Sequence, residues 1–490
     1  MCADVGGICR RKNKGNGVTA MRKTKIVCTI GPACSDEETL EQMALAGMNV
    51  ARLNFSHGTH EDHQQKIDML CCVRERLGLP IAIMLDTKGP EYRIKTFKNG
   101  RVTLKEGDVF SFTVEDVEGD ETRVSVNYKG LVEDLAPGDK ILLNNGLLVF
   151  RVQTVTSTDV VCEVEVGGEL SDRKSMSFPN KLLRQAYLSE QDKQDILFGA
   201  KNGVDFIACS FVSRRQDLLD IKDFMRDNGI EDIELIAKIE NRSGVDNIEE
   251  ICEECSGIMI GRGDMGVEIP FEELPAIQKH LITECRMLGK RVITATEMLE
   301  SMIHNARPTR AEISDVANAV YDGTSAIMLS GETAAGKYPV LAVQTMARIA
   351  TETEANIDFA AWFHSFDFRI RSTLDAISHA TCGMAIDIEA KAIAVCSLSG
   401  KTARMVSRFR CPVDIIGVTT NERTLRKLAL SWGVTPVLSD AYDSIDVLFY
   451  SAKQLAGKTL DLAPGDRIVL TGGQPNGRSG NTNIIKVETI

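Results

Sequence analysis

Residues 233–264 have the sequence IELIAKIENRSGVDNIEEICEECSGIMIGRGD, in which two short apolar runs flank an acidic segment of helical composition. This is the pattern of a parallel β–α–β unit rather than of an antiparallel sandwich. The alternation recurs from residue 24 onward, and each apolar run but one is followed by a turn and a helix. The runs predict an α/β fold, a (β/α)8 TIM barrel, with strands near 25–30, 49–55, 81–86, 204–210, 233–239, 257–261, 291–296 and 325–330.

Local signals mark where the intervening helices begin and end. A Ser or Thr followed three residues later by an acidic side chain fits a capping box, and a Gly after the last helical residue fits a stop. The predicted starts are Ser35 with Glu38, Thr59 with Asp62 and Thr309 with Glu312, and the predicted stops are Gly47 and Gly323.

The third predicted strand is the exception, because a β-rich segment with Gly and Asp turn signals follows it in place of a helix. Loops at this end of a barrel carry function, and we expect an inserted β domain there. After residue 354 the alternation restarts, which predicts a separate α/β domain with a mixed sheet. The predicted domains are a disordered tail (1–21), the barrel (22–89 and 185–353), the β-rich insertion (90–184) and a C-terminal α/β domain (354–490).

Composition limits the partners. The chain of 490 residues carries 57 Lys plus Arg against 69 Asp plus Glu, a formal net charge of −12. A surface that binds nucleic acid or an anionic membrane needs a positive footprint, so we expect neither partner. The 14 cysteines have no repeating spacing in a chain large enough to fold without disulfides, which predicts reduced thiols and a cytoplasmic protein.

Polar side chains gather where the predicted strands end. A barrel strand is buried on both faces, so a charge within it costs several kcal/mol unless it is paired or serves a site at the carboxyl-terminal mouth. Five of the predicted strands end in such residues, which predicts a single functional site at that mouth. The residues are Arg52, Asn54 and Ser56; Asp86, Thr87 and Lys88; Lys238 and Glu240; Arg262 and Asp264; and Thr296 and Glu297.

The types of residue at the mouth suggest a chemistry. Glu240 and Asp264 come from adjacent strands and are oxygen ligands of the kind that Mg²⁺ prefers. Lys238 and Arg52 would face the same anion as this cation. Phosphoryl transfer depends on such positioning and charge neutralisation. The less charged oxygen donors on the neighbouring strands suit a monovalent cation; they are Asn54, Ser56, Asp86 and Thr87.

Several motifs match the signatures of other protein classes only in part. GRGDMG (261–266) matches a dinucleotide fingerprint, but prolines follow at once, so a tight turn with a short helix is the better interpretation. GETAAGKY (331–338) lacks the Ser or Thr of a phosphate-binding P-loop. His57, His60 and His63 are interpreted as a largely solvated helix start rather than a metal cluster, with only His57 expected near a ligand. A zinc site at Cys252 and Cys255 would need two more ligands.

The motifs KTKIVCTIGPA, ARLNFSHG, LDTKGPE, IAKIEN, GRGDMGVEIP, ATEMLESM, RPTRAE and SGETAAGKYP occur in this order, and the chain from Arg22 to Ile490 closely resembles the pyruvate kinase family. The resemblance implies a glycolytic phosphotransferase that converts phosphoenolpyruvate and ADP to pyruvate and ATP with Mg²⁺ (or Mn²⁺) and K⁺. It also implies a mobile lid, a C-terminal regulatory domain and a homotetramer.

The resemblance also implies roles for individual residues. Lys238, assisted by Arg52, would stabilise the phosphoryl group in transfer, and Thr296 would belong to the network that protonates the enolate of pyruvate. The amides of Gly263 and Asp264, with Thr296, would take the substrate carboxylate. The other implied residues are Glu240 and Asp264 for Mg²⁺; Asn54, Ser56, Asp86 and Thr87 for K⁺, with Glu91 marking K⁺ dependence; and Asn54, His57, Arg93 and Lys174 for the nucleotide.

The chain departs from the family pattern in the lid and at the mouth. Asn144 and Asn145 stand where the family usually has two Asp, and SMSFPN (175–180) differs from the usual run, which puts the lid contacts of the nucleotide in doubt. Glu297 replaces a common Gln. Lys238, Glu240 and Asp264 are unaffected, so we expect an active enzyme.

The C-terminal domain carries a predicted effector site. SLSGKT (397–402) follows a strand and opens a helix, so its hydroxyls, Lys401 and amides would form a phosphate nest, although an ordinary capped turn has the same pattern. The facing loop lacks the Trp-Arg pair typical of fructose 1,6-bisphosphate responders, with Arg478 as a substitute. The effector is therefore a bisphosphate, a hexose monophosphate or none, and its predicted ligands are Ser397, Ser399, Gly400, Lys401 and Thr402.

Two other functions stay open at this point. A metal-dependent lyase on a related barrel would act on phosphoenolpyruvate or pyruvate without ADP and without a lid. A catalytically silent paralogue would bind a metabolite as a sensor, although the intact set Lys238, Glu240, Asp264 and Thr296 argues against it.

Overall fold

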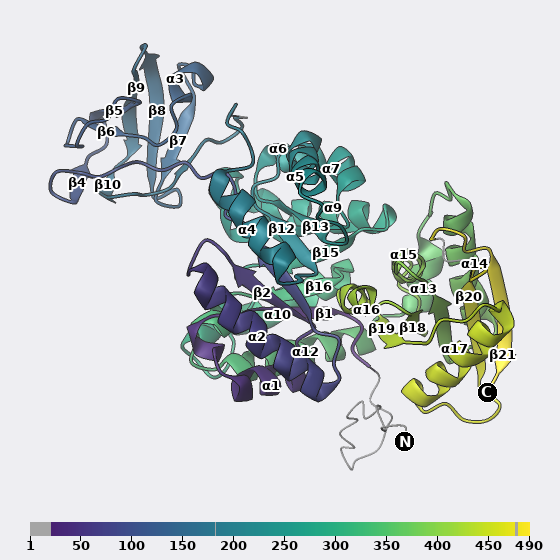
Figure 1. Ribbon diagram of the computed structural model, residues 1–490. Helices are drawn as coiled ribbons and strands as arrows, with labels where there is room; N and C mark the ends of the chain where they lie inside the picture. Colours follow the sequence, from purple (N-terminus) through teal and green to yellow (C-terminus); the bar gives the residue numbers. More distant parts are fainter. Residues whose placement is uncertain (1–20, 182, 476–478) are drawn as a thin grey trace.

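The computed structural model describes residues 21–181, 183–475 and 479–490 (Figure 1). A barrel lies at the centre, the β-rich insertion extends from one side of it, and the C-terminal domain lies on the other side. Residues 1–20, which make up nearly all of the predicted tail, and Arg478 lie outside the described residues.

The eight predicted barrel strands are confirmed, and they form one closed parallel sheet. Each is an apolar run buried along nearly its whole length, because the outer helices cover one face and the barrel core fills the other. The order around the barrel is β1 (Lys25–Thr29), β16 (Ala326–Leu329), β15 (Arg291–Ala295), β14 (Gly257–Gly261), β13 (Glu234–Ile239), β12 (Phe206–Cys209), β3 (Ala82–Asp86) and β2 (Val50–Asn54).

Helices follow the strands and pack outside them (Figure 1). The capping boxes at Thr59 and Thr309 and the stops at Gly47 and Gly323 are confirmed. The Ser35 box is wrong, because the Asp36 carboxylate accepts from the Thr39 amide and begins the helix one residue later. The barrel helices are α1 (Glu37–Ala46), α2 (His60–Leu77), α4 (Glu190–Lys201), α5 (Arg215–Asp227), α6 (Arg242–Asp246), α7 (Ile248–Glu254), α8 (Arg262–Glu268), α9 (Leu274–Met287), α10 (Arg310–Asp322), α11 (Gly331–Ala334) and α12 (Pro339–Ala355).

The insertion after β3 has its own sheets and its own hydrophobic core, in which the rings of Phe110, Phe112 and Phe150 pack edge to face or tilted. Asn144 and Asn145 take φ values of 52° and 58° at the tip of a hairpin, a left-handed conformation that Asn tolerates better than most residues.

The insertion contains two sheets. The six-stranded sheet has the order β11 (Met176–Ser177), β7 (Lys140–Leu143), β8 (Leu148–Val155), β9 (Asp159–Val166), β5 (Val109–Thr113), β6 (Arg123–Ser125). In the other sheet β10 (Gly168–Ser171) pairs with β4 (Arg101–Leu104), and α3 (Leu131–Asp134) is the one described helix of this segment.

The C-terminal domain contains the predicted mixed sheet, in which the last strand runs antiparallel to its neighbour and the other pairs are parallel. The sheet order is β19 (Val434–Leu438), β18 (Asp414–Thr419), β17 (Ala392–Cys396), β20 (Arg467–Gly472), β21 (Ile484–Thr489). Its helices are α13 (Phe359–Ser365), α14 (Thr373–Asp387), α15 (Lys401–Ser407), α16 (Glu422–Leu428) and α17 (Ile445–Leu460).

The C-terminal domain is attached to the amino-terminal ends of the barrel strands. Lys25, the first residue of β1, donates to the Val434 carbonyl at 2.8 Å. Glu234, the first residue of β13, pairs with Arg291 of the barrel and with Arg404 of α15. Burial would raise the pKa of Glu234, but the arginines lower it to about 2. This attachment leaves the opposite, carboxyl-terminal mouth free for substrates.

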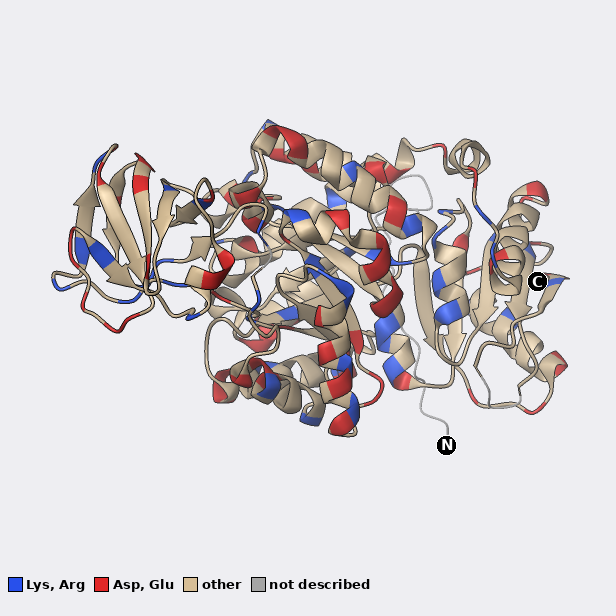
Figure 2. Ribbon diagram, turned by 90° about the horizontal axis from the view of Figure 1, so that it is seen from above, with Lys and Arg blue, Asp and Glu red and all other residues tan. Residues whose placement is uncertain are grey.

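The surface has no single sign of charge in the view of Figure 2, where basic and acidic residues are interspersed along the outer helices and the C-terminal domain. Among the described residues, no helix is long and apolar enough to cross a membrane. The cysteines of the described chain are free thiols, and most of them are buried.

Candidate active site

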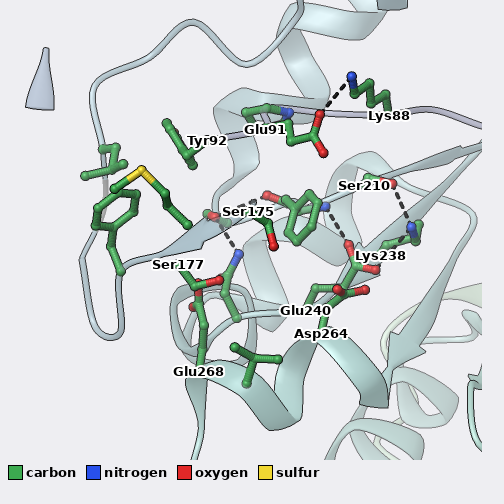
Figure 3. A pocket seen from close by; sticks show the side chains of 18 of the residues that line it. Lys88, Glu91, Tyr92, Ser175, Ser177, Ser210, Lys238, Glu240, Asp264 and Glu268 are labelled. Carbon is green, nitrogen blue, oxygen red and sulfur yellow. Dashed lines mark hydrogen bonds and ion pairs between the residues drawn. The ribbon is translucent and has the colours of Figure 1, made fainter. Parts of the chain in front are cut away.

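A buried lysine lies at the centre of the barrel mouth. The Lys238 ammonium, on β13, donates to the Asp86 carboxylate at 3.1 Å and to the Ser210 hydroxyl at 2.6 Å. The same nitrogen lies 3.1 Å from a Glu240 oxygen. Asp86, at the end of β3, also accepts from Arg52 at 2.5 Å. Strands β2, β3 and β13 thus bring two cations and two carboxylates into one buried group (Figure 3 shows the Lys238 side).

Burial and pairing set the charges of this group. Burial would lower the pKa of the Lys238 ammonium, but the carboxylates of Asp86 and Glu240 outweigh that effect and raise it. Burial would raise the pKa of Asp86, but Arg52 and Lys238 hold it below its usual value. Asp86 is therefore ionised and Lys238 is protonated at neutral pH. A fixed positive charge in a water-poor site interacts strongly with an incoming anion.

Glu240 differs from Asp86, because burial raises its pKa to about 7, with Lys238 opposing the rise and Asp264 adding to it. Its other oxygen accepts from the Phe211 amide at 2.8 Å, and Phe211 takes a φ of 56° to present that amide. A Cβ at Gly261 would lie 2.7 Å from the Glu240 carboxylate. Glycine is needed at the end of β14 because Glu240 packs directly against its backbone.

Asp264 is on the first turn of α8, next to Glu240 at the mouth (Figure 3). Its side chain is exposed, so it faces solvent at the opening rather than the barrel core. Two close carboxylates, one of them a buried acid with a raised pKa, form a set of oxygens that a divalent cation would neutralise. The described residues contain no cluster of three or more His, Cys, Asp or Glu side chains that could hold a metal by themselves.

Thr296 follows β15 with a φ of 68°, and its hydroxyl accepts from the Gly263 amide at 2.9 Å. Its carbonyl accepts from the guanidinium of Arg262, which also pairs with Asp315 at 2.8 Å. Left-handed backbone at a threonine is strained and persists only where neighbours hold it. Arg262, predicted from its place after β14, therefore holds Thr296 and does not line the opening.

A cavity of about 430 Å³ lies between the mouth and the inserted domain. Asp86, Thr87, Gly263, Thr296 and Lys174 are not among the residues that line it. Asp86 and Thr87 are buried beneath its floor. The predicted residues that do line it are Arg52, Asn54, Ser56, His57, Lys88, Glu91, Arg93, Lys238, Glu240 and Asp264.

The residues predicted to hold a monovalent cation lie on β2, β3 and the turns after them. Asn54 and Asp86 are register partners in the sheet. The Asn54 side chain accepts from the Ser56 amide at 3.1 Å, and the Thr87 hydroxyl donates to the Ala208 carbonyl. Both Asp86 oxygens already face cationic side chains.

The residues predicted to contact a nucleotide do not all line the cavity. His57 and Arg93 line the cavity, and Arg93 pairs with Glu91, which also contacts Lys88 at 2.7 Å. Lys174 lies in the insertion, where its carbonyl accepts from the Ile94 amide. Asn145, one of the departures from the family pattern, lines the cavity from the hairpin tip, whereas Asn144 and Glu297 do not line it.

Sequence reasoning missed several residues of the cavity, among them Ser210, Phe211 and Glu268. Ser210 ends a predicted strand, so the rule that selected Lys238 would have found it. Phe211 contributes its amide, which no side-chain pattern signals. Glu268, near Ser177 in Figure 3, accepts from the Phe178 amide of the insertion, and burial raises its pKa to about 7.

A second cavity, of about 340 Å³, lies in the C-terminal domain. Ser397, Ser399, Lys401 and Thr402 line it, while Gly400 turns the chain beneath it with a φ of 73°. The Ser399 and Thr402 hydroxyls each lie 2.7 Å from a hydroxyl of the facing loop, on Ser479 and Thr482.

The closed parallel barrel with a charged group at its carboxyl-terminal mouth has the architecture of a TIM-barrel enzyme. Residues 21–343 match the barrel domain of pyruvate kinase, and residues 375–488 match its alpha/beta domain. The chain belongs to the pyruvate kinase family, and it is an enzyme of the phosphotransferase class.

Individual relatives match over nearly the whole chain. A pyruvate kinase from Clostridium acetobutylicum is 44% identical over 96% of this chain and all of its own length. One from Staphylococcus saprophyticus is 46% identical over 96% of this chain and 81% of its own length. The crystal structure of a pyruvate kinase from Cryptosporidium parvum superposes with a TM-score of 0.91 at 36% identity, covering 96% of both chains.

The contact between Gly261 and Glu240 predicts a sensitive substitution. In Gly261→Ala the new methyl would displace the Glu240 carboxylate, so we expect pyruvate kinase activity to fall by about 10²-fold, the effect of a misplacement of ~1 Å. The matched control is Gly266→Ala on α8, whose Cβ would meet only the flexible tip of Leu274 at 3.3 Å and should keep the rate. An unchanged rate in Gly261→Ala would contradict this account of Glu240.

Proposed function

We propose that the buried group at the mouth transfers the phosphoryl group of phosphoenolpyruvate to ADP, giving ATP and the enolate of pyruvate, which takes up a proton at C3. The observation that carries the proposal is the Lys238 ammonium held between Asp86 and Glu240 beside the cavity. Membership in the pyruvate kinase family supports this reaction over the other two candidates. Nothing in the described part of the chain favours the ADP-independent lyase or the silent paralogue.

Lys238 and Arg52 act on the phosphoryl group. Both are cations at the floor of the cavity, and Asp86 orients both of them from one carboxylate. The phosphoryl group spreads negative charge over its oxygens during transfer, so fixed cations stabilise it in flight. The Ser210 hydroxyl accepts from Lys238 and donates to the Thr87 carbonyl at 2.6 Å, which restricts the lysine to one position.

Glu240 and Asp264 would hold the divalent cation, Mg²⁺ or Mn²⁺. The raised pKa of Glu240 supports this assignment. The Glu240 carboxyl is buried near the Asp264 carboxylate, and the positive charge of Lys238 does not fully offset these two effects. When bound, the cation neutralises phosphate and carboxylate oxygens. The ionised form of Glu240 is the one that binds it.

Asn54, Ser56, Asp86 and Thr87 would hold K⁺, whose weaker field suits a set dominated by uncharged oxygen donors. Glu91, the residue that marks K⁺ dependence by its match to the family, lies at the rim of the cavity and pairs with Lys88 and Arg93. Those two contacts hold the pKa of Glu91 below its usual value against the effect of burial, so the carboxylate is ionised at neutral pH.

Thr296 and the amides of Gly263 and Asp264 would receive the substrate carboxylate, and Thr296 would pass a proton towards the enolate. The hydrogen bond from the Gly263 amide to the Thr296 hydroxyl supports their joint action, because a carboxylate oxygen can replace the hydroxyl as the acceptor of that amide. On the nucleotide side, Asn54, His57 and Arg93 line the cavity beneath the insertion, and Lys174 would reach it when the lid moves.

The second cavity would bind a phosphorylated sugar through Ser397, Ser399, Gly400, Lys401 and Thr402. Hydroxyls, an ammonium and a helix start in one hollow support a phosphate ligand there. We further propose that the protein acts in the cytoplasm as a homotetramer, consistent with its free thiols and with its family.

Replacement of Lys238 tests the reaction. Lys238→Met keeps the length of the side chain but removes the charge, so we expect kcat to fall by at least about 10²-fold to 10³-fold, the loss typical of one electrostatic donor. Lys201→Met, at an exposed position on α4, is the matched control and should keep the wild-type rate. Circular dichroism establishes that both variants fold, and full activity in Lys238→Met would refute the assignment.

A rate titration with sugar phosphates at subsaturating phosphoenolpyruvate tests the second cavity. We expect fructose 1,6-bisphosphate or glucose 6-phosphate to raise the rate several-fold, and Lys401→Ala to abolish the response without changing the basal rate. Lys391→Ala, at an exposed position before β17, should respond as the wild type does. If neither sugar phosphate changes the rate, or if Lys401→Ala responds fully, the effector proposal is wrong.

A further inference from the structure

The histidines at positions 57, 60 and 63 surround the turn between β2 and α2, and each has a different environment. His57 lines the active-site cavity. His63 is 2% exposed, and its ring lies beneath the turn. His60 is half-buried and points towards α4. The predicted solvated helix start is therefore wrong for His63, which belongs to the support of the site.

His63 holds the turn by one hydrogen bond. Its Nε2 lies 2.9 Å from the backbone carbonyl of His57. A carbonyl only accepts, so Nε2 carries the hydrogen of the neutral ring. Nδ1 is buried without a partner in the described structure. Burial lowers the pKa of His63, so the ring stays neutral and keeps this tautomer at neutral pH.

Stacking fixes the ring that makes this bond. The ring of His63 lies parallel to that of Phe55, with centroids 3.9 Å apart and an angle of 10°. Phe55 is itself buried, and its amide donates to the Asp86 carbonyl at 3.0 Å. The turn is thus tied on one side to β3 and on the other to His63.

The same turn carries the side chains that face the cavity. The His57 amide donates to the Asn54 carbonyl at 3.3 Å, and Ser56 lies between these two residues. Asn54, Ser56 and His57 all line the cavity. A shift of the His57 carbonyl would therefore move Asn54, Ser56 and His57 together, but it would not move Lys238, which comes from β13.

His60 ties the turn to the helix that follows the lid. Its Nε2 lies 2.6 Å from the buried carboxylate of Asp195 on α4, and its ring stacks on Phe198 at 4.4 Å. One turn earlier on α4, the Asp192 carboxylate accepts from the amides of Lys88 and Gly89, where the chain enters the lid. Helix α4 thus holds both the start of the lid and the base of the turn.

We propose that His63 is a positioning residue for the nucleotide side of the reaction, acting through its Nε2–H bond to the His57 carbonyl. The inference rests on the proposed function, because it takes the 54–57 turn as part of the ADP and K⁺ sites. It is a role for a side chain that touches no substrate. The proposal also explains why a histidine is buried here. An apolar ring would fill the same space without burying an unpartnered nitrogen, so the N–H donor is what the imidazole adds.

The test compares two substitutions in the full-length chain. His63→Phe keeps the stacking on Phe55 and removes the N–H donor, and His63→Gln keeps a donor at the position of Nε2. We expect His63→Phe to raise KM for ADP by about fivefold, the worth of one ordinary hydrogen bond, with KM for phosphoenolpyruvate within twofold of wild type. We expect His63→Gln to restore KM for ADP to within about twofold.

A purely structural role for His63 would give a different pattern of KM values and unfolding temperatures. Thermal unfolding should place His63→Phe within a few degrees of wild type, because it loses one hydrogen bond and also removes a buried, unpartnered nitrogen. His63→Leu, which also lacks the donor, replaces His63→Phe if the latter does not fold. An unchanged KM for ADP, an equal rise in both KM values, or equal losses in the Gln and Phe variants would overturn the proposal. An inactive wild type would instead refute the proposed function.

Discussion

The interaction on which the site depends is the buried group formed by Lys238, Asp86 and Glu240. Removing one member of a buried ion pair typically costs about 3–5 kcal/mol, because its partner is left charged in a medium that cannot solvate it. The group is therefore a liability for folding unless strands β3 and β13 hold it in place. The requirement to hold these buried charges in place explains which residues surround them. Arg52 shares Asp86, Ser210 fixes the lysine, and Gly261 leaves room for Glu240. The same low dielectric would strengthen the attraction between the lysine and an incoming anion.

The two ends of β13 connect this group to the rest of the molecule. Lys238 is near the carboxyl end, and Glu234 begins the strand at the other end, where Arg291 and Arg404 hold it. Arg404 is on α15, the helix whose first residues line the second cavity. One strand thus links the C-terminal domain to Lys238. At the mouth, the inserted domain contacts the barrel through the Phe178 amide and Glu268, at the far end of the short helix that begins with Arg262 and carries Asp264.

Much of this could be predicted from the sequence, and the failures have physical causes. The eight strands were predictable because strands buried on both faces must be continuous apolar runs, and charges at their ends pointed to Lys238 and Glu240. The role of Phe211 was not predictable, because its contribution is a backbone amide that no residue type encodes. The support from His63 was missed because a histidine at a helix start is usually solvated, and only the tertiary fold places Phe55 over it. Ser35 failed as a cap because the neighbouring Asp36 competes for the same amides.

The most direct test of the central claim is phosphorus NMR of the wild-type protein mixed with phosphoenolpyruvate, ADP, Mg²⁺ and K⁺. The account predicts that the phosphoenolpyruvate signal decays as the γ-phosphate signal of ATP grows by the same amount. It also predicts that transfer stops when ADP is omitted or a chelator removes Mg²⁺, and slows when tetramethylammonium replaces K⁺. Loss of phosphoenolpyruvate without formation of ATP, or at an equal rate without ADP, would contradict the assignment of Lys238 and its partners to phosphoryl transfer.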